Sequence, residues 1–320
     1  MLNRATPQIS IAAVLLLSLS SCRSETAPAS KDQTVVQGQQ VNARGVYAKS
    51  SGGTSFVYVV DGSTSRRLTD ATSGWEADPV LSPDGHLVAY SNGATQSGRA
   101  DIWVAHVDGS HAHRVSSADQ DSLMPGFGAD GRTVFYVISR SFGHSSPIAA
   151  SRRHDFDVVK IATDPDQTIA GSTPVELTQS YFYDVQSLSV SPDGEQFLVS
   201  TSGYPIGGLL QEFRLDHPLR QHRIFQPHVP GESSTGPSFG QARYVGDGME
   251  IVFTAAAEPA GGGNYDYNIY RMSEVTGGDL TQISHHKGMI DSLSVGPQRS
   301  VGFIDASGYS QVNLPAEQSR

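Results

Sequence analysis

The sequence predicts an all-β protein, a six-bladed β-propeller of four-stranded antiparallel blades. Short alternating or continuous apolar runs fill the chain between Gly, Pro, Asp and Ser, and no long apolar stripe has the 3.6-residue period of a helix. An Asp-Gly turn followed by an apolar strand also recurs about every 50 residues, which is the repeat length of propeller blades.

Residues 1–21 are predicted to be a lipoprotein signal peptide. Arg4 gives a positive start, and the apolar run from Ile9 to Leu19 has the length of a signal-peptide core. The run leads into Leu19-Ser20-Ser21-Cys22, which resembles a bacterial lipobox. Because Cys22 is the single cysteine of the chain, no intrachain disulfide is possible. We expect lipidation at Cys22, which implies an extracytoplasmic protein on the periplasmic side of the outer membrane or on the cell surface.

Residues 22–42 are rich in small and polar side chains and are predicted to be a flexible tether, leaving residues 43–320 for the propeller. No later run reaches the 18 apolar residues of a membrane-spanning helix. The formal net charge of -10 at pH 7 argues against nucleic acid as a partner.

The repeat divides the propeller into blades, each ending in a short strand. The predicted blades are residues 35–72, 75–119, 120–180, 181–232, 233–286 and 287–320. The last range shows three strands, and the N-terminal segment QTVVQGQQV can supply the fourth and close the ring. Seven blades would require an extra unit within the third repeat.

The recurring turn has a structural explanation. Pro83 presets φ for the second position of a type I turn, Asp84 bonds to its own backbone, and Gly85 accepts a positive φ. We therefore expect the turn residues to hold hairpins and not to touch a ligand. The set comprises Pro83, Asp84, Gly85, Asp130, Gly131, Pro192, Asp193, Gly194, Asp247 and Gly248.

The best copies of the repeat, Asp78–Ser116 and Ser187–Ser202, resemble the WD-like propeller repeat of the TolB family. That repeat has a Ser-Pro-Asp-Gly turn, an apolar strand, Asp-Ile-aromatic, Asp-Gly and Leu-Thr; Leu-Thr recurs here at residues 68–69, 177–178 and 280–281. The resemblance covers residues 45–320. It implies a fold more than a function, because binding proteins, lyases and peptidase accessory domains share this repeat. TolB itself carries an α/β domain before its propeller, for which the tether has no room, so we expect a TolB-like propeller lipoprotein.

One short motif has the form of a hydrolase nucleophile. Gly236-Pro237-Ser238-Phe239-Gly240 fits G-x-S-x-G, but a strand, a turn and another strand follow it where a hydrolase elbow needs a helix. We interpret it as a coincidental inter-blade loop. No catalytic residue, metal site or cofactor is predicted.

Binding is instead predicted at the face opposite the Asp-Gly turns, where the connections are long. Its polar and aromatic side chains are of the types that form binding hot spots. The candidates are Trp75, Arg99, Arg152, Arg153, His154, Tyr181, Tyr183, Asp184, Tyr265, Asp266, Tyr267, His285 and His286. We expect a non-catalytic module that binds an envelope protein or polysaccharide; the alternative is a carbohydrate lyase or hydrolase with a site at the channel mouth.

Overall fold

The computed structural model describes residues 44–71, 73–144, 151–163, 173–201, 208–229, 238–257, 266–296, 299–305 and 307–315. The chain divides into two compact parts, Met1–Gln33 and Thr34–Arg320, and every described residue belongs to the second part. The signal peptide, Cys22, the tether, the segment proposed to close the ring and Tyr265 lie outside the described residues.

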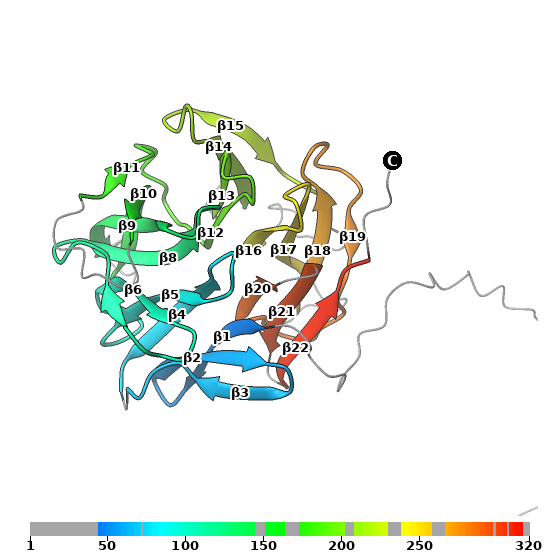
Figure 1. The fold of residues 1–320 in the computed structure, drawn as a ribbon. Coiled ribbons are helices and arrows are strands. Elements are labelled where there is room, and N and C mark those ends of the chain that lie inside the picture. Colours follow the sequence, from blue (N-terminus) through cyan, green and yellow to red (C-terminus); the bar gives the residue numbers. More distant parts are fainter. Residues whose placement is uncertain are drawn as a thin grey trace, which may run out of the picture. The chain divides into compact units, whose positions relative to one another are not determined.

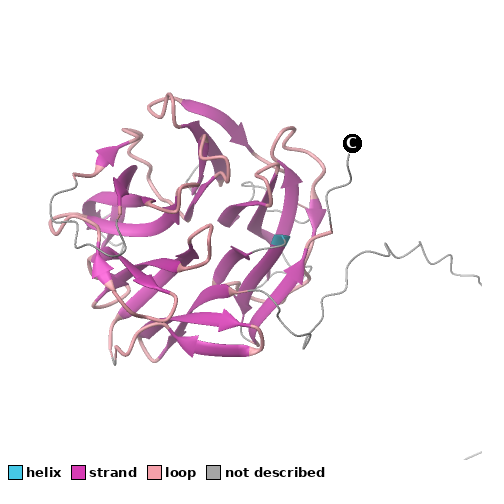
Figure 2. Ribbon diagram, in the orientation of Figure 1, coloured by secondary structure: helices cyan, strands magenta, loops and turns pink. Residues whose placement is uncertain are grey.

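The described residues form 22 β-strands and no α-helix. Figure 2 shows the strands in magenta. The first unit holds β1 (Gly45–Ser51), β2 (Thr54–Asp61) and β3 (Thr64–Arg67). The second holds β4 (Trp75–Leu81), β5 (Leu87–Gly93), β6 (Ala100–His106) and β7 (His113–Arg114). The third holds β8 (Asp121–Phe127), β9 (Thr133–His144), β10 (Ser151–Ala162) and β11 (Val175–Glu176).

The remaining strands form three further units. The fourth unit holds β12 (Ser187–Val190), β13 (Gln196–Thr201), β14 (Leu209–Arg214) and β15 (Gln221–Phe225). The fifth holds β16 (Ser238–Val245), β17 (Glu250–Ala257), β18 (Asp266–Ser273) and β19 (Thr281–Gln282). The sixth holds β20 (Ser292–Gly296), β21 (Ser300–Asp305) and β22 (Gly308–Asn313).

The units have the arrangement of a β-propeller (Figure 1). Each unit is an antiparallel sheet whose strands follow chain order, and each inner strand packs beside the inner strand of the next unit. A single parallel pair, Ser55 with Trp75, links the first two units into one seven-stranded sheet. The prediction of four strands per blade is right for the second to fifth units, whereas the first and last show three strands within the described residues.

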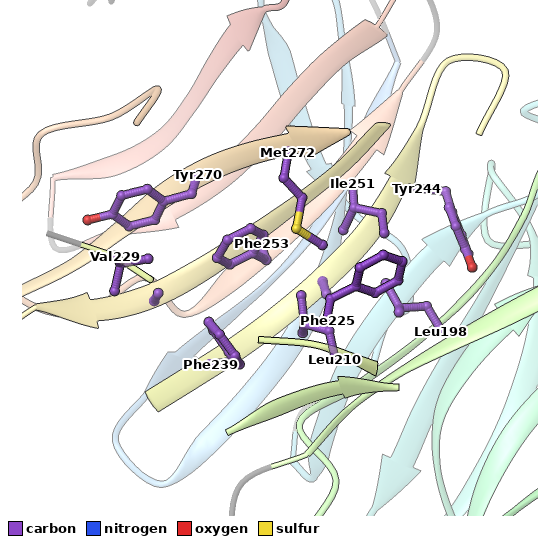
Figure 3. Close-up of a cluster of buried hydrophobic side chains, with 12 residues drawn as sticks. Leu198, Leu210, Phe225, Val229, Phe239, Tyr244, Ile251, Phe253, Tyr270 and Met272 are labelled. Atoms are coloured by element: carbon purple, nitrogen blue, oxygen red, sulfur yellow. The ribbon is translucent and has the colours of Figure 1, made fainter. Parts of the chain in front are cut away.

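Apolar side chains fill the space between neighbouring units, as the repeat requires when one sheet cannot bury both of its faces. In the cluster of Figure 3, Leu198, Leu210 and Phe225 of the fourth unit meet side chains of the fifth. Among these, Phe239 and Phe253 meet edge to face, with ring centroids 5.4 Å apart. Similar clusters lie between the other consecutive units, so the hydrophobic core is distributed around the ring.

The Ser-Pro-Asp-Gly turn is held by its own side chains. Ser82 Oγ donates to Asp84 Oδ1 over 2.6 Å, and the N–H of His86 donates to the same oxygen over 3.0 Å. These hydrogen bonds, that of Ser82 first, hold the pKa of Asp84 below its usual range. Gly85 has a φ of 72°, which a side chain would oppose. Asp193 and Gly194 repeat the arrangement, and Asp130 and Asp247 each accept backbone hydrogen bonds in their own turns.

A second recurring contact explains why the repeat pairs an Asp with a distant Thr or Ser. Thr178 Oγ1 accepts from the N–H of Val158 and donates to Asp157, each over 2.9 Å. In the second unit the N–H of Ile102 donates to Ser116 Oγ over 3.0 Å in the same way. The hydroxyl therefore fastens the short outer strand to the third strand of its unit.

The turns also touch one another. A Cβ on Gly248 would lie 3.0 Å from Pro192 Cδ, and one on Gly194 would lie 3.1 Å from the Cβ of Ala129. Each of these glycines therefore adopts a positive φ and also faces the turn of the preceding unit. The turns are thus tightly packed against one another.

Candidate functional site

Two cavities occupy opposite ends of the propeller axis. We call the end that carries the Asp-Gly turns the turn end, and the end where the inner strands begin the loop end. The cavity at the turn end has a volume of about 470 Å³ and that at the loop end about 290 Å³. Inner strands line both, so residues far apart in sequence meet there.

The loop-end cavity is lined by apolar, polar and charged side chains. Trp75, Met124 and Gln241 line it together with Asp78 and Arg153. Of the residues predicted for the binding face, Trp75 and Arg153 belong to this wall. The cavity therefore offers an aromatic ring, a carboxylate and a guanidinium within one enclosed space.

Asp78 is the most constrained of these groups. Its φ is 52° and it lies at a β-bulge between Ala77 and Val80 in the pairing of β4 with β5. Ser91 Oγ donates to Asp78 Oδ2 over 3.0 Å and accepts from the N–H of Met124 over the same distance. Burial raises the pKa of Asp78, although the Ser91 hydrogen bond and the charge of Arg243 oppose the rise.

A second feature of the loop end is an exposed aromatic and cationic surface, which we call the rim patch: Arg140, Phe142, Arg152, Tyr181 and Tyr183. Strands β9 and β10 are 12 residues long, against seven for their counterparts β5 and β6. Their extra length carries Phe142 and Arg152, and the chain after β11 brings the two tyrosines beside them.

The rings of the rim patch face solvent although they are large. Phe142 and Tyr181 are each 58% exposed, and Tyr183 is 48% exposed. The guanidinium of Arg152 lies 4.4 Å from the centre of the Tyr183 ring, and that of Arg140 lies 5.7 Å from the centre of the Tyr181 ring. Two of the predicted residues, Arg152 and Tyr183, are thus in contact, and the predicted Tyr181 meets Arg140 instead.

Buried polar contacts hold the rim patch in place. Asp157 is fully buried and accepts from Arg140 Nε over 2.8 Å. The same carboxylate accepts from the N–H of Ser180 over 2.7 Å, which fixes the backbone next to Tyr181. Asp157 therefore supports the part of the rim patch that contains Arg140 and Tyr181.

Several other predicted residues act as loop anchors. Arg153 Nε donates to Asp121 Oδ2 over 2.6 Å, and Arg99 Nε donates to the carbonyl of Gln120 over 3.1 Å. Asp184 accepts from Gln186 over 2.8 Å, and Asp266 accepts from the N–H of Gly288 over 2.8 Å. Tyr267 packs against the core between the fifth and sixth units.

The three predicted histidines have separate partners. His154 Nδ1 lies 2.9 Å from Asp155 Oδ2, and His285 Nδ1 lies 3.1 Å from Gln282 Nε2. His286 Nδ1 lies 2.9 Å from Asp305 Oδ2, with its ring edge-on to Phe303. The His286–Asp305 pair belongs to the junction of the fifth and sixth units, whereas Arg152 and Tyr183 meet beside the third.

The G-x-S-x-G motif lies in a strand where the structure describes it. Ser238 begins β16, and the hairpin partner β17 follows. Gly240 packs so closely on Thr254 that a Cβ would collide with the Thr254 hydroxyl. The glycine thus has a packing role, and residues 236 and 237 lie outside the described residues.

No group of three or more His, Cys, Asp or Glu side chains among the described residues is arranged to hold a metal ion. No described helix has the length and apolar character needed to cross a membrane.

Four side chains that the structure makes prominent were not predicted from the sequence: Asp78, Arg140, Phe142 and Arg243. Asp78 was visible as the start of the best repeat copy, and Arg243 as a charge within an inner strand. Alternation alone does not distinguish the channel side of an inner strand from the side that packs on a neighbour, especially when a bulge shifts the register.

Comparison with known sequences found no matching family model and no matching curated protein. Solved structures do share the fold. TolB from Acinetobacter baumannii is similar with a TM-score of 0.57 and 15% identity, over 86% of this chain and 64% of that one. The chain therefore spans less than two thirds of the length of that protein.

Two enzymes have comparable similarity. A gluconolactonase from Xanthomonas campestris has a TM-score of 0.54 and 15% identity, over 81% of this chain and 79% of that one. An oligogalacturonate lyase in complex with manganese has a TM-score of 0.51 and 13% identity, over 83% and 68%. At these identities the comparisons show a TolB-like propeller fold, which non-enzymatic proteins and enzymes share.

Proposed function

We propose that this chain is a lipid-anchored protein of the bacterial cell envelope, and that its propeller is a non-catalytic module that binds an envelope protein or polysaccharide through the loop end. The observation that carries the proposal is the rim patch, because three large aromatic rings stay exposed there while hydrogen bonds to the buried carboxylate of Asp157 fix Arg140 and the backbone next to Tyr181.

The chemistry of the rim patch suits an interface. Tyr and Arg are enriched among residues that dominate binding energy, and a ring held in place loses little conformational entropy on binding. Arg152 stacked on Tyr183 presents a cation and an aromatic face together. Such a surface can stack on sugar rings or accept acidic and aromatic side chains.

The architecture supports a closed platform for this surface. We infer that the first and last units are the end blades of a six-bladed ring. Tyr47 of β1 stacks on Tyr309 of β22 with ring centroids 5.1 Å apart, and Val60 and Ile304 pack in the same cluster. β1 also lies against β20. These contacts would close the ring through side-chain packing.

The binding proposal can be tested with rim-patch variants in intact cells. Cross-linking followed by purification of the chain should recover a specific partner with the wild type and lose most of it with Tyr183→Ala and Arg152→Ala. Met249→Ala is the matched control, because Met249 is 47% exposed but lies beside the Asp247-Gly248 turn at the turn end. Equal recovery with all three variants would count against the loop end.

The anchor is proposed on the lipobox-like sequence alone. Cys22→Ala should move the protein from the membrane fraction to the soluble fraction, because the remaining chain has no other predicted attachment. Fractionation that does not change would argue against lipidation at Cys22.

A carbohydrate lyase or hydrolase is the second candidate, and one observation favours it. The His286–Asp305 pair orients an imidazole as a general base requires. If this pair is catalytic, the purified chain should act on a substrate such as oligogalacturonate or gluconolactone, and His286→Ala should abolish that activity. Turnover that His286→Ala leaves intact would exclude this pair.

A further inference from the structure

The turn-end cavity contains an arginine whose charge is poorly compensated. Arg243 lines the cavity from β16, and within the described residues its guanidinium makes one hydrogen bond, over 2.9 Å from Nη1 to the carbonyl of Ala242. No described carboxylate lies within the 4.0 Å ion-pair distance of it. Most of its donor capacity is therefore available to a ligand.

The other arginines of the same cavity differ from Arg243. Arg44 Nη2 lies 3.2 Å from Asp61 Oδ2, and Arg299 is paired with Glu250. Both are thus already neutralised by carboxylates outside the cavity wall. Of the three arginines that line the cavity, Arg243 is therefore the one without an ion pair to a described carboxylate.

Burial disfavours the charged form of Arg243. Burial lowers the pKa of Arg243 to about 10, and the charge of Asp78 offsets this only in part. Burial in turn raises the pKa of Asp78, so the ionised form of this carboxyl group is also disfavoured. A buried cation in this state gains more from an incoming anion than a solvated one does.

The rest of the wall limits what that anion can be. Much of the lining is apolar, and the contributing side chains include Val46, Val80, Phe127, Leu188, Val190 and Val295. Asp84 also lines the cavity, and its lowered pKa keeps it ionised, which disfavours a multiply charged anion. A volume of about 470 Å³ accommodates a small molecule and not a folded partner.

We propose that the turn-end cavity binds a small amphipathic carboxylate, with its carboxylate paired to the guanidinium of Arg243 and its apolar body against the apolar wall. The planar fork of an arginine matches a carboxylate through two parallel hydrogen bonds. This site is separate from the rim patch, so either can exist without the other.

Octanoate is a suitable probe, measured by equilibrium dialysis against the full chain with Cys22→Ala, which keeps acyl groups from competing. We expect one saturable site per chain. Arg243→Met should weaken binding about tenfold to a hundredfold, as expected for loss of a hydrogen-bonded charge partner. Arg299→Met is the matched control and should bind within about twofold of the parent, because Arg299 is already paired.

The parent protein alone provides a second test, which does not depend on the folding of Arg243→Met. Octan-1-ol and octylamine have the same apolar chain, but one is neutral and the other cationic, and neither should show the saturable site. Absence of saturable octanoate binding, equal binding of octan-1-ol, or octanoate binding that Arg243→Met leaves unchanged would each overturn the proposal.

Discussion

The two ends of the propeller are built from the same strands but differ in kind. At the turn end, short turns repeat the same hydrogen bonds and pack on one another, as Pro192 does on Gly248. At the loop end the connections vary, and one hairpin extends to carry the rim patch. The repeated end nevertheless encloses the larger cavity.

A repeated structural unit can still carry a functional site in this fold. A repeated turn fixes the positions of the inner strands, and the side chains that those strands present to the axis can still differ from unit to unit. Arg243 in the fifth unit and Asp78 in the second are examples. At the loop end, candidate binding residues lie on a hairpin that is longer than its counterparts. At the turn end, the candidate residue Arg243 lies on an inner strand whose position the repeated turns fix.

The largest effect on stability is expected at the support of the loop end. Asp157→Ala removes a buried carboxylate that accepts from Thr178, Ser180 and Arg140, and leaves their donors unpaired. We expect a loss of about 3–5 kcal/mol in the free energy of unfolding, measured by urea denaturation. Asp84→Ala at the turn end should cost only about 1 kcal/mol, because Asp84 is near solvent. Similar losses would remove the contrast between the two supports.

The packing of the turns predicts unequal glycine substitutions. Gly85 and Gly248 have φ values of 72° and 98°, so alanine should cost about 1–2 kcal/mol at either position. At Gly248 the new Cβ would also meet Pro192 Cδ at 3.0 Å, whereas nothing lies within 4 Å at Gly85. Overpacking should add about 1–3 kcal/mol at Gly248. Equal thermal shifts for the two variants would mean that the turns do not support one another.

A pH effect should arise beside the turn-end cavity. Tyr244 lines that cavity and donates to Glu212 over 2.9 Å. Burial first, and then the charge of Glu274, raise the pKa of Glu212 to about 7, although the Tyr244 hydrogen bond and Arg223 act in the opposite direction.

Because the folded pKa of Glu212 lies above its unfolded value, the folded state holds a proton that the unfolded state has released between about pH 4.5 and 7. This contribution to stability is complete below pH 4.5 and is lost as the pH rises to 7. The loss is at most about 3 kcal/mol. Glu212→Gln should flatten the pH dependence of the unfolding free energy over this range; an unchanged slope would contradict the assignment.

The smallest effect on stability is expected at the rim patch itself. Tyr183→Ala should change the unfolding free energy by less than about 1 kcal/mol, since the ring is 48% exposed and its stacking with Arg152 is accessible to water. A large loss in urea denaturation would show that Tyr183 serves the fold and not an interface.

The fold was more predictable than the site. The Ser-Pro-Asp-Gly turns and the Asp-Ile-aromatic and Leu-Thr pairings are local signals, and the structure shows the hydrogen bonds that make them recur. Arg152, Tyr181 and Tyr183 were found by residue type within long connections. The exposure of Phe142 depends on how far one hairpin extends. The role of Arg243 depends on contacts across the axis, and local sequence periodicity does not predict such contacts.

The proposed division between the two ends can be tested most directly by photo-cross-linking in living cells. A benzophenone amino acid would be placed at Tyr183 in the rim patch and, in a second strain, at Met249 at the turn end. The proposal predicts a discrete adduct from position 183 that is lost when Arg152→Ala is added, and none from position 249. Adducts from position 249 alone, or from both positions equally, would contradict binding through the loop end.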